Sequence, residues 1–167
     1  VGDPLDEATD VGPVIDAGSR ERIASWISEA AAAGAEVVTG GEVEGTLIRP
    51  TVLDGIEPTM KVSCEEVFGP VVGVAAYHDI DEAIALADGS PFGLQAGIFT
   101  ARVDHALAWA RRLHFGGVLI NETPTFRADQ QPYGGVKDSG NTREGPSFAV
   151  QTMTEPKLIV ISLPDDG

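Results

Sequence analysis

The spacing of apolar side chains near the start of the chain indicates an amphipathic helix. Apolar residues recur there at the three- and four-residue intervals that place side chains on one helical face, namely Ile23, Trp26, Ile27, Ala30 and Ala31. Gly34 follows this run and suits the left-handed conformation that ends many helices. The pattern therefore predicts a helix over residues 17–33.

Short apolar runs follow, and they predict strands. Residues 35–41 (AEVVTGG) predict a short strand with a turn, and residues 46–56 predict extended chain because Pro50 would break a helix. Residues 71–77 (VVGVAAY) form a continuous apolar run, which predicts a strand covered on both faces.

The second half of the chain alternates helical and extended patterns. In residues 79–90, Asp79 and Glu82 have the spacing of a capping box, and Gly89 can end the helix. Residues 96–100 and 116–121 predict buried strands, and Thr100 can cap a helix between them that carries Val103, Leu107, Ala110 and Leu113. This order predicts an α/β fold of three layers with right-handed crossovers and a largely parallel sheet.

The long loop after the last of these strands is a candidate working loop. Ligands gather at the carboxyl ends of strands in parallel sheets, which directs attention to the residues after Thr100 and Asn121. Residues 123–145 (TPTFRADQQPYGGVKDSGNTREG) are rich in glycine and mixed in charge. Such a loop is longer than a simple connection needs, which favours a functional role.

Charge and composition limit the possible partners. The chain has 167 residues, with 26 acidic against 11 basic side chains and a formal charge of -15, which disfavours nucleic acid and anionic membrane surfaces. No run of about 18 apolar residues predicts a membrane span, and no leader pattern is visible, so we expect a cytoplasmic protein. The chain opens on VGDPLDEATDVGP without Met, which suggests a piece of a longer polypeptide.

The residues alone offer weak candidates for chemistry. Cys64 is the one cysteine, and the three histidines, His78, His105 and His114, are scattered along the chain. This spacing shows neither a metal ligand set nor a base positioned beside the thiol, so we predict no metal site and interpret Cys64 as a buried or incidental thiol. Glu65 and Glu66, taken alone, are typical of a solvated pair before a strand.

Six segments together resemble a known family. In order along the chain they are GDPLDEATDVGPVI, RPTVL, EEVFGPVV, PFGLQAGIFT, GGVLIN and PYGGVKDSGNTREG. They are similar to the C-terminal part of the NAD(P)-dependent aldehyde dehydrogenase superfamily, in its lactaldehyde-dehydrogenase-like branch. The resemblance implies that residues 1–153 are the C-terminal part of the catalytic domain and that residues 154–167 are the oligomerisation strand and tail.

The resemblance implies roles for residues near a cofactor, which would be NAD or NADP. Glu66 matches the carboxylate that accepts hydrogen bonds from the nicotinamide-side ribose, and Phe68 matches an aromatic residue that packs near this ribose and the nicotinamide. Ser19 and Arg22 match positions near the adenosine-side ribose where family members often have Gln and Lys. Arg22 keeps the positive charge of that position, so it is a candidate for cofactor contact.

The resemblance also implies a substrate tunnel. Phe126 and Tyr133 match aromatic residues that line it, and we hypothesise that Arg127 meets an anionic group of the aldehyde. Glu144 matches an acidic residue associated with the proton and water route, although an ion pair with a neighbouring Arg143 or Lys137 is an equally good interpretation. Asn121 matches an asparagine that orders the backbone of the active site, and we interpret it as structural.

The implied activity is oxidation of an aldehyde to a carboxylic acid with NAD(P). The attacking cysteine, the base and the dinucleotide-binding domain lie upstream in the family, so the chain alone is expected to be inactive. Residues 155–164 (EPKLIVISLP) match a strand that pairs across a homodimer or homotetramer interface, although an edge strand of its own domain is the plainer interpretation. The alternative function is a naturally encoded, non-catalytic oligomerisation or binding module.

Overall fold

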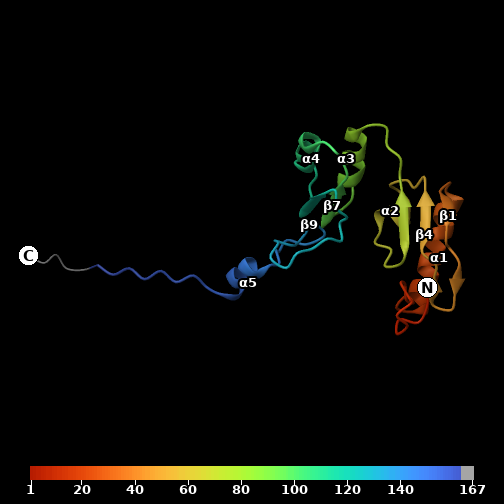
Figure 1. Ribbon diagram of the computed structural model, residues 1–167, viewed down its shortest axis with the longest axis horizontal. Coiled ribbons are helices and arrows are strands. Elements are labelled where there is room, and N and C mark those ends of the chain that lie inside the picture. Colours follow the sequence, from red (N-terminus) through yellow and green to blue (C-terminus); the bar gives the residue numbers. More distant parts are fainter. Residues whose placement is uncertain (163–167) are drawn as a thin grey trace, which may run out of the picture. The chain divides into compact units, whose positions relative to one another are not determined.

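The computed structural model describes residues 1–162 and divides the chain into two compact units, Val1–Leu86 and Ala87–Gly167, here called unit 1 and unit 2 (Figure 1). The elements of unit 1 are α1 (Ala17–Ala32), β1 (Glu36–Thr39), β2 (Val43–Glu44), β3 (Leu47–Ile48), β4 (Thr51–Asp54), α2 (Lys61–Cys64) and β5 (Val71–Val74). Helix α3 (Ile80–Asp88) spans the boundary. Unit 2 contains β6 (Phe92–Gly93), β7 (Gln95–Ile98), α4 (Val103–Ala110), β8 (Gly117–Ile120), β9 (Val136–Lys137) and α5 (Pro146–Met153).

Helix α1 confirms the helix predicted from the first apolar pattern. The side chain of Asp16 accepts a hydrogen bond from the backbone N–H of Ser19 at 2.6 Å and so caps the helix. After the last turn, Gly34 has a φ of 111° and donates its N–H to the carbonyl of Ala31. The helix ends at Ala32, one residue before the predicted end.

The sheet of unit 1 has mixed strand directions. Its order is β1-β4-β5, with β1 antiparallel and β5 parallel to β4, while β2 and β3 form a separate antiparallel pair. The positive φ angles of Gly40 and Gly41 turn the chain after β1 and allow it to come back antiparallel. The prediction of one largely parallel sheet is therefore not confirmed, because the described strands form four small sheets, of which one is mixed, two are antiparallel and one is parallel.

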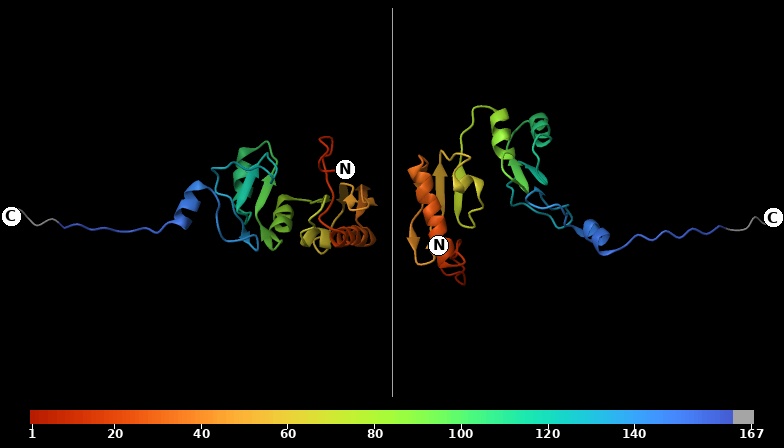
Figure 2. Two further views of the ribbon diagram at one scale, coloured as in Figure 1. Left: turned by 90° about the horizontal axis from the view of Figure 1, so that it is seen from below. Right: turned by 180° about the vertical axis from the view of Figure 1, so that it is seen from behind.

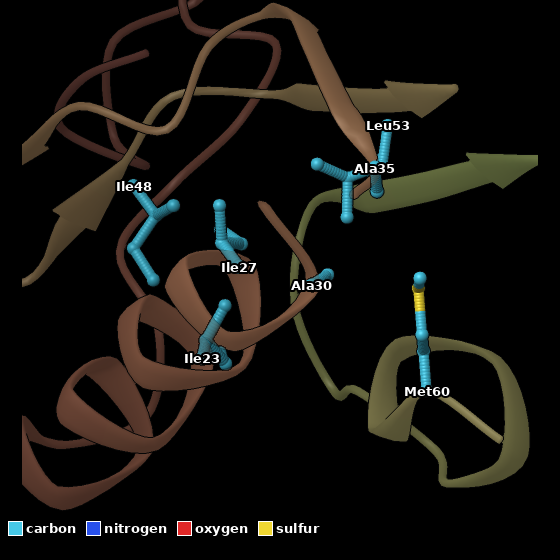
Figure 3. Packing of buried hydrophobic residues seen from close by; sticks show 7 residues of the cluster. All are labelled: Ile23, Ile27, Ala30, Ala35, Ile48, Leu53 and Met60. Carbon is cyan, nitrogen blue, oxygen red and sulfur yellow. The ribbon is translucent and has the colours of Figure 1, made fainter. Parts of the chain in front are cut away.

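The core of unit 1 lies between α1 and one face of this sheet. Helices α1 and α2 cover the same face (Figure 2). The buried residues of this core are Ile23, Ile27, Ala30, Ala35, Ile48, Leu53 and Met60 (Figure 3). Leu53 and Ile23 are 0% exposed, so α1 is fixed firmly against β4.

Strand β5 is exposed on its other face, which contradicts the prediction of a strand covered on both faces. Val71 and Gly73 pair with Thr51 and Leu53 and lie on the same face of the sheet as these residues, where Val71 is half-buried. Val72, on the opposite face, is 55% exposed. An apolar run indicates that a strand is suited to burial on both faces. It does not indicate whether other segments of these 167 residues pack against both faces.

In unit 2, strands β7 and β8 confirm the predicted crossover. They pair in parallel over four residues each, and α4 connects them. Strands β6 and β9 form a separate antiparallel pair. Thr100 does not cap α4, because the N-cap position is Arg102; the Thr100 hydroxyl instead accepts from the Arg102 N–H at 3.2 Å.

The predicted capping box of α3 is present in a shifted form. The carboxylate of Asp79 accepts from the N–H of Glu82 at 2.9 Å, as predicted. The carboxylate of Glu82 accepts a hydrogen bond from the N–H of His78 at 2.6 Å, whereas a capping box would use the N–H of Asp79, one residue later.

The segment after α5 is extended and has no strand partner in the described part of the chain. Leu158, Ile159, Val160 and Ile161 are between 74% and 87% exposed. The interpretation of residues 155–164 as an edge strand of their own domain is therefore wrong for residues 155–162. Residues 163 and 164 lie outside the described residues.

Candidate functional site

The loop of residues 65–70, here called the Glu66 loop, connects α2 to β5 and is fixed at both ends. The N–H of Glu65 donates to the carbonyl of Lys61 at 3.0 Å. At the other end, the carbonyl of Pro70 accepts from the N–H of Thr51 at 2.8 Å. Helix α2 and strand β4 thus set where the loop begins and ends.

The middle of the Glu66 loop presents a carboxylate and an aromatic ring to solvent. Glu66 is exposed, and within residues 1–162 its carboxylate has no hydrogen-bond partner. Phe68 is 73% exposed and has a φ of 49°. A left-handed conformation costs a bulky residue on the order of 1 kcal/mol and is typical of sites where the fold holds a side chain ready for a ligand.

Arg22 lies against the backbone of the Glu66 loop. One terminal nitrogen of its guanidinium donates to the carbonyl of Val67 at 2.8 Å. The guanidinium carbon lies 4.7 Å from the centre of the Trp26 ring, one helical turn further along α1. The cofactor contact predicted for Arg22 stays a prediction, and the contact present is with the loop.

A second candidate region lies in unit 2. A pocket of about 550 Å³ opens there, and it is lined by Gln95, Gly116, Gly117, Val118, Leu119, Ile120, Glu122, Phe126, Gln131, Pro132 and Tyr133. Phe126 and Tyr133, the two aromatic residues predicted to line a tunnel, thus both lie in its wall. Its lining combines apolar side chains of β8 with polar ones such as Gln95 and Glu122, a mixture that small-molecule sites also have.

Arg127 contacts two of the other predicted residues. Its guanidinium forms an ion pair with the carboxylate of Glu144 at 2.7 Å and lies 4.4 Å from the centre of the Tyr133 ring. The backbones of Tyr133 and Glu144 also pair, with the Tyr133 N–H donating to the Glu144 carbonyl at 3.1 Å. This bridge brings both residues to Arg127.

The ion pair predicted as the alternative role of Glu144 exists, but with a different partner. Arg143 donates to the carbonyl of Gly135 at 2.8 Å, and Lys137 pairs with Asp88 at 2.9 Å. Neither is therefore the partner of Glu144. The partner of Glu144 is Arg127, which lies 17 residues earlier in the chain, and sequence spacing did not indicate this pair.

Asn121 hydrogen-bonds to backbone groups, which agrees with its interpretation as a structural residue. Its side-chain oxygen accepts from the N–H of Thr100 at 2.8 Å, and its amide nitrogen donates to the Thr100 carbonyl at 3.0 Å. Its own φ is 55°, at the end of β8. Asn121 therefore ties the ends of β7 and β8 together beside the pocket.

Cys64 is half-buried at the end of α2 and forms no disulfide. Among residues 1–162, no three His, Cys, Asp or Glu side chains lie together as a metal ligand set. No helix in that part of the chain is long and apolar enough to cross a membrane.

Sequence reasoning missed the contacts that join distant segments. Trp26 was assigned to the apolar face of α1, and its position one turn after Arg22 was the signal that the two side chains could stack. Nothing in the sequence indicated that Arg22 reaches Val67, 45 residues away.

Comparison with known proteins gives consistent matches. The model of the aldehyde dehydrogenase family matches residues 1–159. The chain is 45% identical over 163 residues to 3-sulfolactaldehyde dehydrogenase of Priestia aryabhattai, which covers 98% of this chain and 34% of that relative. It is 42% identical over 161 residues to lactaldehyde dehydrogenase of Methanococcus maripaludis, which covers 96% of this chain and 34% of that relative. The chain thus spans about a third of the length of these curated relatives.

Solved structures agree with these relatives. Aldehyde dehydrogenase 21 of Physcomitrella patens, in complex with the reaction product succinate, matches with a TM-score of 0.91 and 40% identity over 96% of this chain and 33% of its own. Glyceraldehyde-3-phosphate dehydrogenase of Methanocaldococcus jannaschii, complexed with NADP, matches with a TM-score of 0.91 and 36% identity over 97% of this chain and 35% of its own. The α/β fold, the family model and the relatives agree, and the chain belongs to the aldehyde dehydrogenase family.

Proposed function

We propose that this chain is part of an NAD(P)-dependent aldehyde dehydrogenase that oxidises an aldehyde to a carboxylic acid. The family match and the names of the relatives support the reaction class. The observation that carries the proposal is the Glu66 loop, which presents an unpartnered carboxylate and an exposed aromatic ring on a strained backbone. A carboxylate accepts hydrogen bonds from vicinal ribose hydroxyls, and an aromatic face restrains a planar ring beside them.

The residues of this chain would bind and orient rather than attack. When bound, NAD(P) supplies the acceptor for the hydride that leaves the aldehyde. Glu66 would hold the ribose, Phe68 would limit movement of the nicotinamide end, and Asn121 would keep the strand ends in place. Cys64 is half-buried at the end of α2, so we assign the reacting thiol to a cysteine outside these 167 residues and expect the chain alone to be inactive.

The pocket of unit 2 would hold the aldehyde, with Phe126 and Tyr133 shielding it from water. Arg127 would meet an anionic group, because a guanidinium pairs well with carboxylate and sulfonate oxygens. Two comparisons support this class of substrate, since 3-sulfolactaldehyde bears a sulfonate and succinate is a dicarboxylate. In the structure Arg127 is paired with Glu144, so the anionic group of the substrate would either share the guanidinium with the Glu144 carboxylate or displace this carboxylate. A role of Glu144 in the proton route stays the alternative.

The exposed segment Leu158–Ile161 favours assembly of several copies. Its apolar side chains have no cover within residues 1–162, and its backbone has no strand partner there. We therefore propose that it pairs with a second copy in a homodimer or homotetramer. A cytoplasmic location stays a prediction. A non-catalytic oligomerisation or binding module is the second candidate function, and this same segment favours it.

The test of the reaction is an assay of the full-length polypeptide that carries this chain. We expect formation of NADH or NADPH, followed by its absorbance, when an anionic aldehyde is added. Glu66→Gln should raise the Kd of the cofactor on the order of tenfold, because a charged acceptor is lost. Glu65→Gln is the matched control, since the neighbouring carboxylate is also exposed. A full-length protein without NAD(P)-dependent oxidation would leave the non-catalytic module as the function.

The substrate class has a separate test. In the full-length enzyme, Arg127→Ala should lower kcat/KM for an anionic aldehyde about tenfold or more while changing a neutral aldehyde little. Arg102→Ala is the control, because Arg102 is an exposed arginine paired with Asp104. Unchanged discrimination between the two aldehydes would show that Arg127 does not read the anionic group.

A further inference from the structure

Two contacts hold the middle of the Glu66 loop. The side chain of Val67 packs against the buried cluster of unit 1, and helix α1 supplies a side-chain hydrogen bond to the backbone of the loop. The ends of the loop are fixed by α2 and β4, but the peptides that carry Glu66 and Phe68 lie between these anchors. Arg22 reaches the carbonyl of Val67, the residue between them, at 2.8 Å. A shift of this one peptide would move both exposed side chains together.

Arg22 is itself positioned with little freedom. The next residue, Ile23, is 0% exposed in the core, so the backbone of α1 cannot rotate without disturbing the packing of unit 1. The Trp26 ring lies 4.7 Å from the guanidinium carbon and covers one face of the guanidinium, while the Val67 carbonyl accepts at its edge. The guanidinium is therefore a preformed donor, half-buried, with the Val67 carbonyl as its acceptor.

The same helix contacts the loop at a second point. A methyl group added to Gly69 would lie 2.6 Å from Cδ1 of Ile23, which shows how closely the loop approaches α1 there. Phe68, with its φ of 49°, lies between these two contacts. A strained residue keeps its conformation when the surrounding structure fixes the backbone on either side.

We propose that Arg22 is a positioning residue for cofactor binding, which acts through the Val67 carbonyl to set the placement of Glu66 and Phe68. The inference rests on the proposed function and changes the role predicted for Arg22 from direct contact with the cofactor to support of the loop. The ligand concerned is the nicotinamide-side nucleoside of NAD(P).

The experiment compares Arg22→Gln, Arg22→Lys and Arg20→Gln with wild type in the full-length polypeptide. Binding of NAD+ and NADP+ is titrated by calorimetry without aldehyde, and melting temperature and the KM of the aldehyde are recorded. Arg20→Gln is a matched control, because Arg20 lies on the same helix and its guanidinium also donates to a backbone carbonyl, that of Gly45 at 2.9 Å. Both substitutions remove one charge from α1.

Arg22→Gln should raise the Kd of the cofactor on the order of tenfold, with the KM of the aldehyde near that of wild type. Arg22→Lys should recover part of the affinity, since an ammonium can still donate to the carbonyl. Arg20→Gln should stay within about twofold. Cofactor affinity unchanged in Arg22→Gln, or lowered equally in Arg22→Gln and Arg20→Gln, would overturn the proposal.

Two further variants keep the test valid if Arg22→Gln does not fold. Gly69→Ala leaves Arg22 in place and displaces the loop from the side of Ile23, so it should also weaken cofactor binding. In a double variant, Gly69→Ala should add little to the loss caused by Glu66→Gln, because both act on one contact. Wild-type affinity in Gly69→Ala, or multiplied losses in the double variant, would contradict the proposal.

The outcomes separate this inference from the proposed function. A wild-type protein that binds neither NAD+ nor NADP+ contradicts the proposed function. A wild-type protein that binds a cofactor with the same affinity as Arg22→Gln contradicts the role of Arg22 alone.

Discussion

In unit 1 an apolar helix face packs against a sheet, whereas the elements within unit 2 contact one another mainly through polar side chains and glycines. The buried cluster of unit 1 includes Ile23 and Leu53, both 0% exposed. In the described part of unit 2, the buried apolar side chain is the methyl group of Ala106, and Leu107 beside it is 52% exposed. The Glu66 loop thus rests on an apolar core, while the Arg127 region rests on hydrogen bonds and close backbone contacts.

Lys137 shows how unit 2 replaces apolar burial. Its ammonium donates to the carboxylate of Asp88, to the carbonyl of Asp88 and to the carbonyl of Ser90, at distances of 2.9, 2.8 and 3.2 Å. It also lies 5.3 Å from the centre of the Phe115 ring. Such a network is strong only while every partner is present. The stability of unit 2 should therefore depend on charge and pH, whereas the stability of unit 1 should depend on the volume of its buried side chains.

The largest effect should come from removing volume in unit 1. Leu53→Ala should lower the free energy of unfolding by about 3 kcal/mol, because it leaves a cavity in a fully buried site. The same change at Leu107, which is 52% exposed, should cost less than about 1 kcal/mol. Urea unfolding followed by circular dichroism measures both, and equal losses would show that the two units do not differ in this respect.

The next largest effect should come from adding volume between backbones in unit 2. A methyl group at Gly116 would lie 1.7 Å from the carbonyl oxygen of Gly134, so Gly116→Ala should destabilise the protein by about 2 kcal/mol or more. The neighbouring Gly117→Ala meets only the flexible side chain of Gln95, at 3.2 Å, and should cost less. Melting temperatures of the two variants would decide, and a Gly117 variant as unstable as the Gly116 variant would contradict the close-contact explanation.

Removal of the Lys137 ammonium tests the polar network. Lys137→Met should cost about 2 kcal/mol, since a side chain that is 18% exposed loses three hydrogen-bond acceptors. Lys157→Met, at an exposed lysine of the same unit, should change the stability by less than about 0.5 kcal/mol. Denaturant midpoints that fall equally in both variants would show that the loss of charge, and not the network, is responsible.

The same network predicts a dependence on pH. The hydrogen bond from the Lys137 ammonium, together with the N–H of His114, lowers the pKa of Asp88 below its ordinary value of 3.8. A lowered pKa stabilises the fold above the pKa of the unfolded state, and this contribution is lost as the pH falls through the folded pKa. Between pH 6 and pH 2, wild type should therefore lose more stability than Asp88→Asn, as urea midpoints would show. A parallel decline in the two proteins would argue against this linkage.

The smallest effect on stability should come from the Arg127 ion pair. Its side chains are 44% and 63% exposed, so solvent screens the attraction, and Arg127→Ala should cost less than about 1 kcal/mol. Thermal unfolding of this variant beside Lys137→Met compares an exposed pair with a half-buried one. A loss for Arg127→Ala as large as that for Lys137→Met would mean that the exposed pair is part of the scaffold.

Local patterns predicted the parts of the fold whose causes are local. The helix over residues 17–33 ends one residue early at Ala32, and the α4 crossover between β7 and β8 is present as predicted. The antiparallel pairing of β1 and the 55% exposure of Val72 were not predicted, because they depend on which distant segments pair and cover each face. Sequence periodicity carries no direct information on such partners.

The candidate site shows the same limit. The resemblance singled out Glu66, Phe126 and Tyr133, and the structure places the last two in one pocket wall. The contact of Arg22 with Val67 and the pair of Arg127 with Glu144 were not predicted, because each joins residues that lie 45 or 17 positions apart. The functional roles of all these residues stay predictions.

The exposed segment after α5 has a consequence for the life of the protein in a cell. Leu158, Ile159, Val160 and Ile161 form a run of strong β-formers without charge, the composition that promotes cross-β stacking between chains. Pro156 and Lys157 precede the run and act as gatekeepers on one side, since proline cannot donate to a ladder and lysine repels its copies. Copies that have not formed the pairing proposed above would expose this run to one another, so slower synthesis or lower temperature should reduce aggregation.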